Sequence, residues 1–339
     1  MSAINNILSL IEKLSIKEKE TLKAHLLNDS NISNVNMEEF VTNERFSSGR
    51  ACPICGSIHV VRNGRRADGA QRYICRDCNK SFIARTSSIV AGTQKDISVW
   101  EQYIFCMMNA FSIRKSAEIC GIHRNTAFYW RHKILDALQN MANNVELDGI
   151  IEADETFFSV SYKGSRNLTR VAHKRGGEVH TRGLSHEKVC VPCAVNRNGL
   201  SIAKISNLGR VSTQAIHNVY DGKIAQDSTI VTDKASAYIR FADANSLKLV
   251  QLKNGVAKKG IYNIQHINNY HSRLKKFMQN FNGVATKYLN NYLAWNNFVN
   301  YAKETDGEKK NILMRFTLTT VKNITCRQIS HRATLPICA

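Results

Sequence analysis

The sequence predicts a multidomain chain: a small helical N-terminus, a cysteine-containing β module, a helical module and then a larger α/β domain. Three observations predict this order. Two Cys-x-x-Cys pairs lie within residues 52–78, a helical pattern with a central glycine covers residues 112–140, and from residue 148 onward β-rich and helical segments alternate. The 339 residues are enough for two or three domains of about 150 residues each.

The first 47 residues are predicted to form a helical segment and a linker. Apolar residues recur at helical spacing over residues 4–27, and Ser15 begins the sequence S-I-K-E, a capping-box pattern that starts a second helix. Residues 28–47 are polar and are interpreted as the linker. Because the N-terminal pattern includes acidic residues, it is not typical of a signal peptide.

Residues 48–90 are predicted to form a zinc ribbon. Its two knuckles each carry a pair of thiols that together can surround one Zn²⁺ tetrahedrally: Cys52, Cys55, Cys75 and Cys78. Gly56 and Asn79 follow the second cysteine of each knuckle, where the chain turns sharply and a positive φ is tolerated. The alternative is two chance pairs or disulfides, but both spacings fall within the ranges typical of zinc sites.

Residues 91–145 are predicted to hold a helix-turn-helix. The first helix covers residues 112–120, and Gly121 supplies the left-handed turn residue that the motif requires. The second helix carries an apolar stripe at positions 127, 130, 134 and 138. Off that stripe lie the candidates for contact with bases or phosphates: Arg124, Asn125, Tyr129 and Lys133. A generic helical hairpin with a solvated basic face is the alternative.

The charge balance favours a polyanionic partner. The chain has 47 Lys and Arg against 27 Asp and Glu, a net charge of +20, and its pI is about 9.6. A soluble chain this basic usually binds nucleic acid, although a basic surface can also serve solubility alone. Arg65 and Arg66 in the ribbon are therefore further candidates for DNA contact. No apolar run approaches the ~18 residues of a membrane span, so no membrane partner is expected. Zinc thiolates and scattered cysteines suit a reducing cytoplasm.

Residues 146–305 are predicted to form an α/β domain with the element order β-β-β-α-β-α-β-α, which is that of a ribonuclease-H-like fold. The predicted strands are residues 150–158, 189–195, 200–205, 228–232 and 248–252, and the predicted helices are residues 213–220 and 235–244 and a long helix that begins at residue 268.

Acidic residues occupy two of these strands. Alternation along the first strand places Glu152 and Asp154 on one face and Glu155 on the other. Asp233 follows a later strand, at the edge where open α/β sheets hold ligands. Carboxylates from neighbouring strand ends can bind Mg²⁺, and two ions about 4 Å apart support phosphodiester chemistry. Taken singly, each aspartate is more often a helix cap or a salt-bridge partner.

The sequence resembles DDE-class insertion-sequence transposases, and most closely the IS1595 family. The resemblance covers about residues 50–300 and rests on the ribbon, the helix-turn-helix and the motifs A-D-E-T-F-F, V-T-D-K-A-S-A-Y and H-I-N-N-Y-H-S-R-L-K. It implies that Asp154 and Asp233 are the first two members of a metal-binding triad.

The third member of the triad departs from the usual pattern. Family members usually carry Glu there, with a basic residue seven positions later. Asn268 falls at this position, thirty-five residues after Asp233, and Lys275 follows it by seven, which makes this chain a D-D-N-K variant. Asn269 and His271 are the alternative assignments within the helix.

An amide in place of the third carboxylate lowers the negative charge of the site by one. Metal affinity should fall unless another acid contributes, and Glu152 and Glu155 are the nearest candidates, although a β-edge salt bridge is the simpler role for both. The resemblance also predicts that Lys275, with Arg273 and Lys276, contacts the DNA backbone near the scissile phosphate. A solvated basic helix face is the alternative.

The resemblance implies a transposase of the bacterial cytoplasm and nucleoid, with residues 306–339 as a C-terminal tail. Such an enzyme would bind double-stranded DNA at the terminal inverted repeats of an insertion sequence, act as a homo-oligomer, and use two Mg²⁺ or Mn²⁺ ions for strand cleavage and strand transfer, besides a structural Zn²⁺. The alternative, which Asn268 favours, is a catalytically impaired or domesticated transposase that acts as a DNA-binding regulator.

Overall fold

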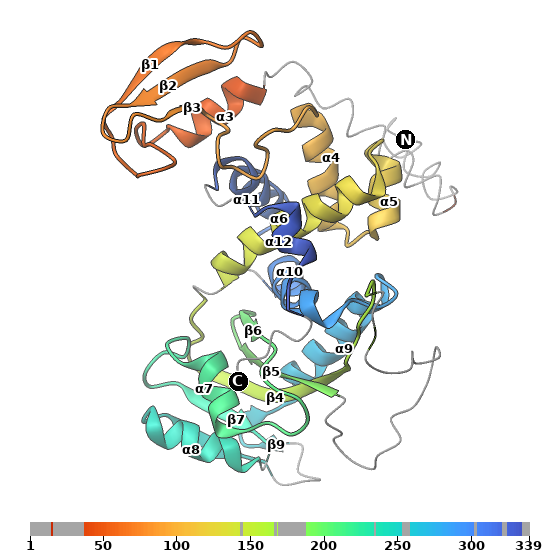
Figure 1. Cartoon of the computed structure of the whole chain (residues 1–339). Helices are drawn as coiled ribbons and strands as arrows, with labels where there is room; N and C mark the ends of the chain where they lie inside the picture. The colour runs from red at the N-terminus through yellow and green to blue at the C-terminus, as the bar shows by residue number, and fades with distance from the viewer. Residues whose placement is uncertain are drawn as a thin grey trace, which may run out of the picture. The chain divides into compact units, whose positions relative to one another are not determined.

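The computed structural model describes residues 37–142, 145–165, 188–233, 235–252, 258–301, 304–320 and 324–333, together with Ser15 and Leu168. Apart from Ser15, the predicted N-terminal helices lie outside the described residues. The chain divides into two compact units (Figure 1). The first comprises residues 1–109, 113–127 and 317–323, and the second comprises residues 110–112, 128–316 and 324–339.

Within its described residues, the first unit contains a short helix, a small antiparallel sheet and two further helices. Their bounds are α3 Met37–Arg45, β1 Val60–Arg65, β2 Gln71–Cys75, β3 Ser81–Ile83, α4 Ile97–Met108 and α5 Ile113–Ile119. The sheet has the order β1-β2-β3. Its apolar core is small, with Tyr73 packed between the rings of Phe46 and Phe82 at centroid distances of 5.2 and 5.7 Å. A core of this size cannot stabilise the sheet alone.

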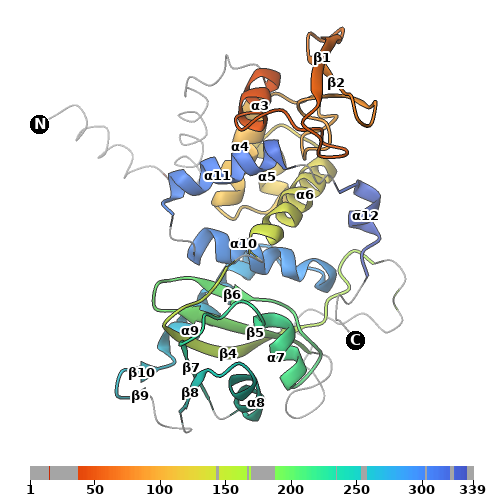
Figure 2. The ribbon, with the colours of Figure 1, turned by 90° about the vertical axis from the view of Figure 1, so that its left-hand side faces the viewer.

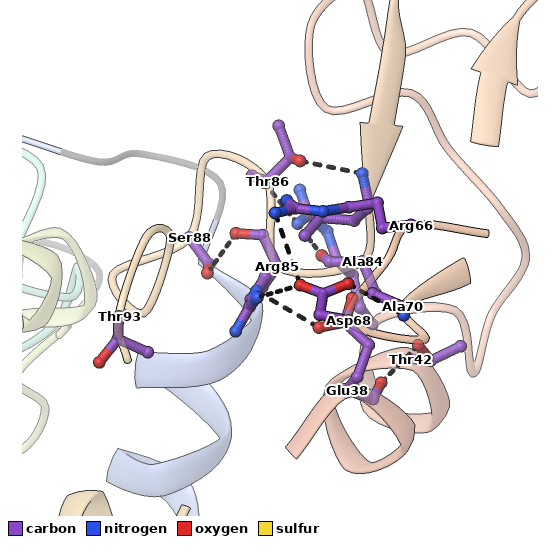
Figure 3. A network of polar contacts seen from close by, with 12 residues as sticks. Glu38, Thr42, Arg66, Asp68, Ala70, Ala84, Arg85, Thr86, Ser88 and Thr93 are labelled. Carbon is purple, nitrogen blue, oxygen red and sulfur yellow. Dashed lines mark hydrogen bonds and ion pairs between the residues drawn. The ribbon is translucent and has the colours of Figure 1, made fainter. Parts of the chain in front are cut away.

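A polar network ties α3 to the small sheet. The guanidinium of Arg85 lies between two carboxylates (Figure 3) and is 3.4 Å from Glu38 and 3.4 Å from Asp68. Arg45, at the end of α3, donates to the carbonyl of Thr86 at 2.6 Å. These contacts join α3, the β1–β2 turn and the segment after β3, so that ion pairs supplement the small apolar core.

The predicted pair of helices around Gly121 is present. After α5, Gly121 adopts φ 58°, and the N–H of Ile122 donates back to the carbonyl of Ala117 at 3.0 Å. Helix α6 then spans Arg124–Ala142. The division between the two units falls within α6, so its first turn belongs to the first unit and the rest to the second.

The second unit is built on a five-stranded mixed sheet with the order β6-β5-β4-β7-β8. The strands are β4 Ile150–Ser159, β5 Lys188–Asn196, β6 Ser201–Ala203, β7 Thr229–Thr232 and β8 Lys248–Gln251. Strand β4 pairs antiparallel with β5 and parallel with β7. The order of elements matches the predicted β-β-β-α-β-α-β-α, with an additional hairpin of β9 Lys258–Lys259 and β10 Tyr262–Asn263 before the last helix.

Helices cover both faces of this sheet (Figure 2). Helices α7 Thr213–Tyr220 and α8 Ser236–Ala244 pack on one face against Ile151 and Ala153 of β4. Helices α9 Gln265–Gln279 and α10 Leu289–Tyr301 pack on the other face against Val191 and Val195 of β5. The mixed helix and sheet architecture predicted for this part of the chain is therefore confirmed.

The described part of the predicted C-terminal tail includes the helices α11 Asp306–Thr319 and α12 Cys326–Ser330. Helix α12 docks within the second unit: Ile329 is fully buried, and its carbonyl accepts a hydrogen bond from the hydroxyl of Tyr288 at 3.0 Å. Next to it, Lys287 donates to the carbonyl of Ser330 at 3.0 Å. Among the described residues, no helix has the length and hydropathy required to span a membrane.

Candidate functional site

The four ribbon cysteines converge. The Sγ atoms of Cys52 and Cys78 are 3.7 Å apart, and those of Cys55 and Cys75 are 3.6 Å apart. A Zn–S bond of about 2.3 Å sets the edge of a tetrahedral thiolate site at about 3.8 Å, so the spacing fits Zn²⁺. In the described part of the chain, this is the one group of three or more Cys, His, Asp or Glu residues whose ligand atoms all lie within 4.8 Å of one another.

The turns of both knuckles have the geometry that the sequence predicts. Gly56 and Asn79 adopt φ values of 79° and 54°. In the first knuckle, the N–H of Gly56 donates to the carbonyl of Cys52 at 2.9 Å, and in the second the N–H of Cys75 donates to the carbonyl of Lys80 at 3.1 Å. Backbone N–H groups of Cys78 and Asp77 lower the pKa of Cys75 to about 6, which favours its thiolate. At Cys55 a backbone hydrogen bond at Ser57 lowers the pKa, but burial and the neighbouring thiols outweigh it and raise the pKa to about 12.

The two predicted catalytic aspartates come from neighbouring strands. The parallel register of β4 and β7 pairs Ile151 with Ile230 and Glu152 with Val231. Two residues further along each strand, this register brings Asp154 level with Asp233. Asp233 directly follows β7, and its carboxylate accepts a hydrogen bond from the N–H of Ala235 at 3.1 Å. The sheet therefore brings the two carboxylates to one edge.

The environment of Asp154 disfavours its charged form. Burial raises the pKa of Asp154 to about 6, and the negative charge of Asp233 adds to the rise, while Lys275 acts in the opposite direction. His271 of α9 lies on the same side, with its Nδ1 atom 3.8 Å from the Asp154 carboxylate. Burial lowers the pKa of His271 to about 4, so the imidazole is neutral at pH 7. A divalent cation would relieve the repulsion between the carboxylates.

Glu155 lies on the opposite face of β4, as the alternation predicts. Burial raises its pKa to about 7; the hydroxyl of Tyr238 offsets part of this effect, and the charges of Asp154 and Asp233 add to it. The pKa of Glu155 thus depends on the charges of the two aspartates. Its side chain, however, faces helices α7 and α8 and not α9.

Glu152 fixes the beginning of α9. Its carboxylate is almost fully buried and accepts hydrogen bonds from the N–H groups of His266 at 2.7 Å and Ile267 at 3.2 Å. It also contacts the imidazole of His266 at 2.7 Å and the guanidinium of Arg197 at 3.7 Å. These bonds satisfy donors that a helix N-terminus leaves unpaired, which explains why the helix begins at Gln265 and not at the predicted residue 268.

The remaining predicted residues of α9 occupy different environments. Asn268 is exposed in the first turn, its N–H donates to the carbonyl of Ile264 at 3.2 Å, and within the described chain its side chain makes no hydrogen bond to either aspartate. Lys275 and Lys276 are exposed. Arg273 places its guanidinium 5.7 Å from the ring centre of Tyr301 on α10. The donor set of Asp154, Asp233 and Asn268 offers the oxygen ligands that Mg²⁺ takes, but side-chain rotation is needed to bring them onto one ion.

Comparison with known families assigns both sites to named domains. Residues 146–299, which contain the sheet and α9, match the family of the ISXO2-like transposase domain. The sheet unit carries a transposase domain of the IS1595 family. Residues 50–79, which hold the four cysteines, match the InsA N-terminal domain, and the zinc-ribbon prediction is thereby confirmed.

The relatives of this chain are distant. An uncharacterized protein in transposable element ISH50 of Halobacterium salinarum is 23% identical over 253 residues, which cover 74% of this chain and 84% of that protein. The Mos1 mariner paired end complex with Mn matches 68% of this chain and 77% of its own at 10% identity and a TM-score of 0.26. A pre-cleavage Mos1 transpososome matches 69% and 82% at 7% identity and a TM-score of 0.19. These TM-scores are too low to carry an argument.

The residues predicted to contact DNA fall into two groups. Arg65, Arg124 and Asn125 are exposed, and Lys133 is half-buried on α6. Arg66 is exposed but lies 3.5 Å from Asp68, and the hydroxyl of Tyr129 is 3.1 Å from that of Ser330 in α12.

Sequence reasoning did not find two of the roles seen around Asp154. For Glu152 the sequence suggests a salt bridge or a contribution to the metal site but not a helix cap, because its helix partner lies 114 residues away along the chain. His271 was named only as an alternative ligand. The signal that places both is the alternation along β4, since the residues that share a face with Asp154 must meet the helix that covers that face.

Proposed function

We propose that this transposase binds the terminal inverted repeats of an insertion sequence and catalyses metal-dependent DNA strand cleavage and strand transfer. The sheet unit acts as a ribonuclease-H-like catalytic domain. One observation carries the proposal: the register of β4 and β7 brings Asp154 and Asp233 to the same sheet edge, on the side of Asp154 that α9 covers. The raised pKa of Asp154 supports a cation site at that edge.

Three side chains would hold the divalent ions: Asp154, Asp233 and Asn268. Divalent ions held there would supply activation of an attacking oxygen and stabilisation of the leaving oxygen of a phosphodiester. Lys275 acts on the DNA backbone near the scissile phosphate, and its influence on the pKa of Asp154 supports a position beside the site. Arg273 and Lys276 would contribute on the same helix, although Arg273 also stacks toward Tyr301.

DNA binding is assigned to the first unit and to α6. The zinc ribbon with Arg65 and Arg66, and the helix-turn-helix with Arg124, Asn125, Tyr129 and Lys133, would contact double-stranded DNA. A net charge of +20 supports this partner. Since both ends of an element must be processed, the active species is a homo-oligomer.

Nicking of supercoiled DNA tests the proposal. The substrate is a plasmid that carries the DNA flanking the gene on both sides, incubated with Mg²⁺ or Mn²⁺. The wild type should nick it, Asp154→Ala should not, and both should bind the flanking DNA equally. Asp243→Ala, which changes an exposed aspartate on α8, is the matched control and should nick like the wild type.

The same assay distinguishes the proposed transposition chemistry from a second candidate function. Because Asn268 replaces an acid, a DNA-binding regulator without catalysis is the competing assignment. Specific binding of the flanking DNA without any nicking by the wild type, in either metal, would favour the regulator and contradict the transposition chemistry.

A further inference from the structure

His271 has an unusual position for a helical histidine. Only 9% of its surface is exposed, and its Nε2 atom is buried without a hydrogen-bond partner. Its Nδ1 atom faces the Asp154 carboxylate at 3.8 Å, too far for a direct hydrogen bond. A buried polar atom without a partner costs free energy, and the other ring nitrogen, Nδ1, is the one that faces the carboxylate and is placed to bind a cation there.

The helix places this imidazole beside the proposed metal site. His271 lies three residues after Asn268 and four before Lys275, so all three residues occupy one face of α9. The hydrogen bonds from the first turn of α9 to Glu152 fix the register of the helix against β4. His271 is therefore held opposite Asp154 by the strand that carries Asp154 itself.

We propose that His271 is a ligand of the divalent ion held at Asp154 and Asp233, which supplements the neutral amide of Asn268. The inference rests on the proposed function, because it assumes a catalytic cation at this sheet edge. It adds a nitrogen ligand to a site otherwise built from oxygen donors.

The observed spacing is compatible with shared coordination. Octahedral ligands at about 2.05 Å from an ion lie about 2.9 Å apart when adjacent and about 4.1 Å apart when opposite. The 3.8 Å between His271 and Asp154 falls between these values. The ligand atoms of His271, Asp154 and Asp233 do not all lie within 4.8 Å of one another, so side chains must rotate to share one ion. Mg²⁺ takes hard oxygen ligands, whereas first-row transition ions also accept imidazole, so the site should prefer Mn²⁺ to Mg²⁺.

Pulsed electron paramagnetic resonance of Mn²⁺ tests the ligand directly. The full-length protein with its ribbon zinc in place is loaded with Mn²⁺, and the echo modulation from a directly bound imidazole nitrogen is recorded. The wild type should give this modulation, and labelling the histidines with ¹⁵N should change it without any mutation. His271→Asn should abolish it and weaken Mn²⁺ binding by at least about ten-fold, with little change for Mg²⁺.

A matched control is available in the same domain. His217 lies on α7 with its Nδ1 atom 2.9 Å from the carboxylate of Asp221, so it also pairs an imidazole with an acid, but at the surface. His217→Asn should leave both the modulation and the Mn²⁺ affinity unchanged. Persistence of the modulation in His271→Asn would overturn the inference.

The remaining outcomes separate this inference from the proposed function. If Asp154→Asn removes Mn²⁺ binding but the wild type has no nitrogen modulation, His271 is not a ligand, while the metal site stands. If Mn²⁺ binding does not depend on Asp154 at all, both the ligand assignment and the proposed metal site are wrong.

Discussion

The carboxylate of Glu152 accepts a hydrogen bond from the backbone N–H of His266 at 2.7 Å and thereby joins the central strand of the sheet to the first turn of α9. Asp154 lies two residues along the same strand, and His271 and Lys275 lie along the same helix. A single buried acid thus sets the relative positions of the two elements that form the candidate site.

Replacing Glu152 by Gln should destabilise the domain by about 1.5–3 kcal/mol, because buried charge-assisted hydrogen bonds to the helix N-terminus are weakened. Urea unfolding of the full-length protein measures the change. The exposed Glu304 provides a control, and Glu304→Gln should have almost no effect. Equal stability of the two variants would contradict the capping role of Glu152.

Replacing Cys75 by Ser should reduce zinc binding from about one ion per chain to well below one and unfold the ribbon, whose apolar core is small. Metal analysis and circular dichroism report the two effects. Cys326→Ser, which changes an exposed cysteine outside the cluster, should retain zinc. Full zinc content in the Cys75 variant would exclude a four-cysteine site.

The stability of Glu155→Gln relative to the wild type should depend on pH. The folded wild type binds the Glu155 proton more tightly than the unfolded chain does, because its pKa is raised from 4.5 to about 7. The stability that this proton binding contributes is fully present below pH 4.5 and is lost as the pH rises toward about 7. The variant should therefore gain stability relative to the wild type between pH 4.5 and pH 7, as measured by urea unfolding in Mg²⁺-free buffer. A difference that does not change with pH would refute the elevated pKa.

Arg124 and Tyr129 should differ in their effect on DNA affinity. Arg124→Ala should weaken binding at all sequences and reduce the slope of log affinity against log salt by about 0.9, the value for one lost phosphate contact. Tyr129→Phe keeps the aromatic ring for DNA contact and removes only a hydroxyl that contacts Ser330, so it should weaken DNA affinity less than Arg124→Ala does. A larger loss for Tyr129→Phe than for Arg124→Ala would reverse this assignment.

Asn268→Glu should preserve or raise Mg²⁺-dependent nicking, since a carboxylate restores the charge that the amide lacks. Calorimetric Mg²⁺ binding and plasmid nicking provide the two measurements. If the variant folds normally but binds no Mg²⁺ and does not nick, the third ligand position is not residue 268.

Local patterns in the sequence were sufficient where the chemistry itself is local. Cysteine spacing predicts the ribbon cluster, and the alternation along residues 150–158 correctly separates Glu152 and Asp154 from Glu155. Contacts between residues far apart along the chain could not be predicted from local patterns. The hydroxyl of Tyr129 meets Ser330, which lies 201 residues further along the chain, and the helical start at Gln265 depends on a strand that precedes it by more than 100 residues.

Strand β4 pairs with β5 along nearly its whole length, and Asp154 is opposite Cys193 in this register. On its other side, β4 pairs with β7 as far as Glu152. Moving the backbone of Asp154 would break ladder bonds in the centre of the sheet. If the protein changes conformation on binding a polyanion, the backbone of β4 should stay in place. The change should then come from side-chain rotation or from a shift of a helix.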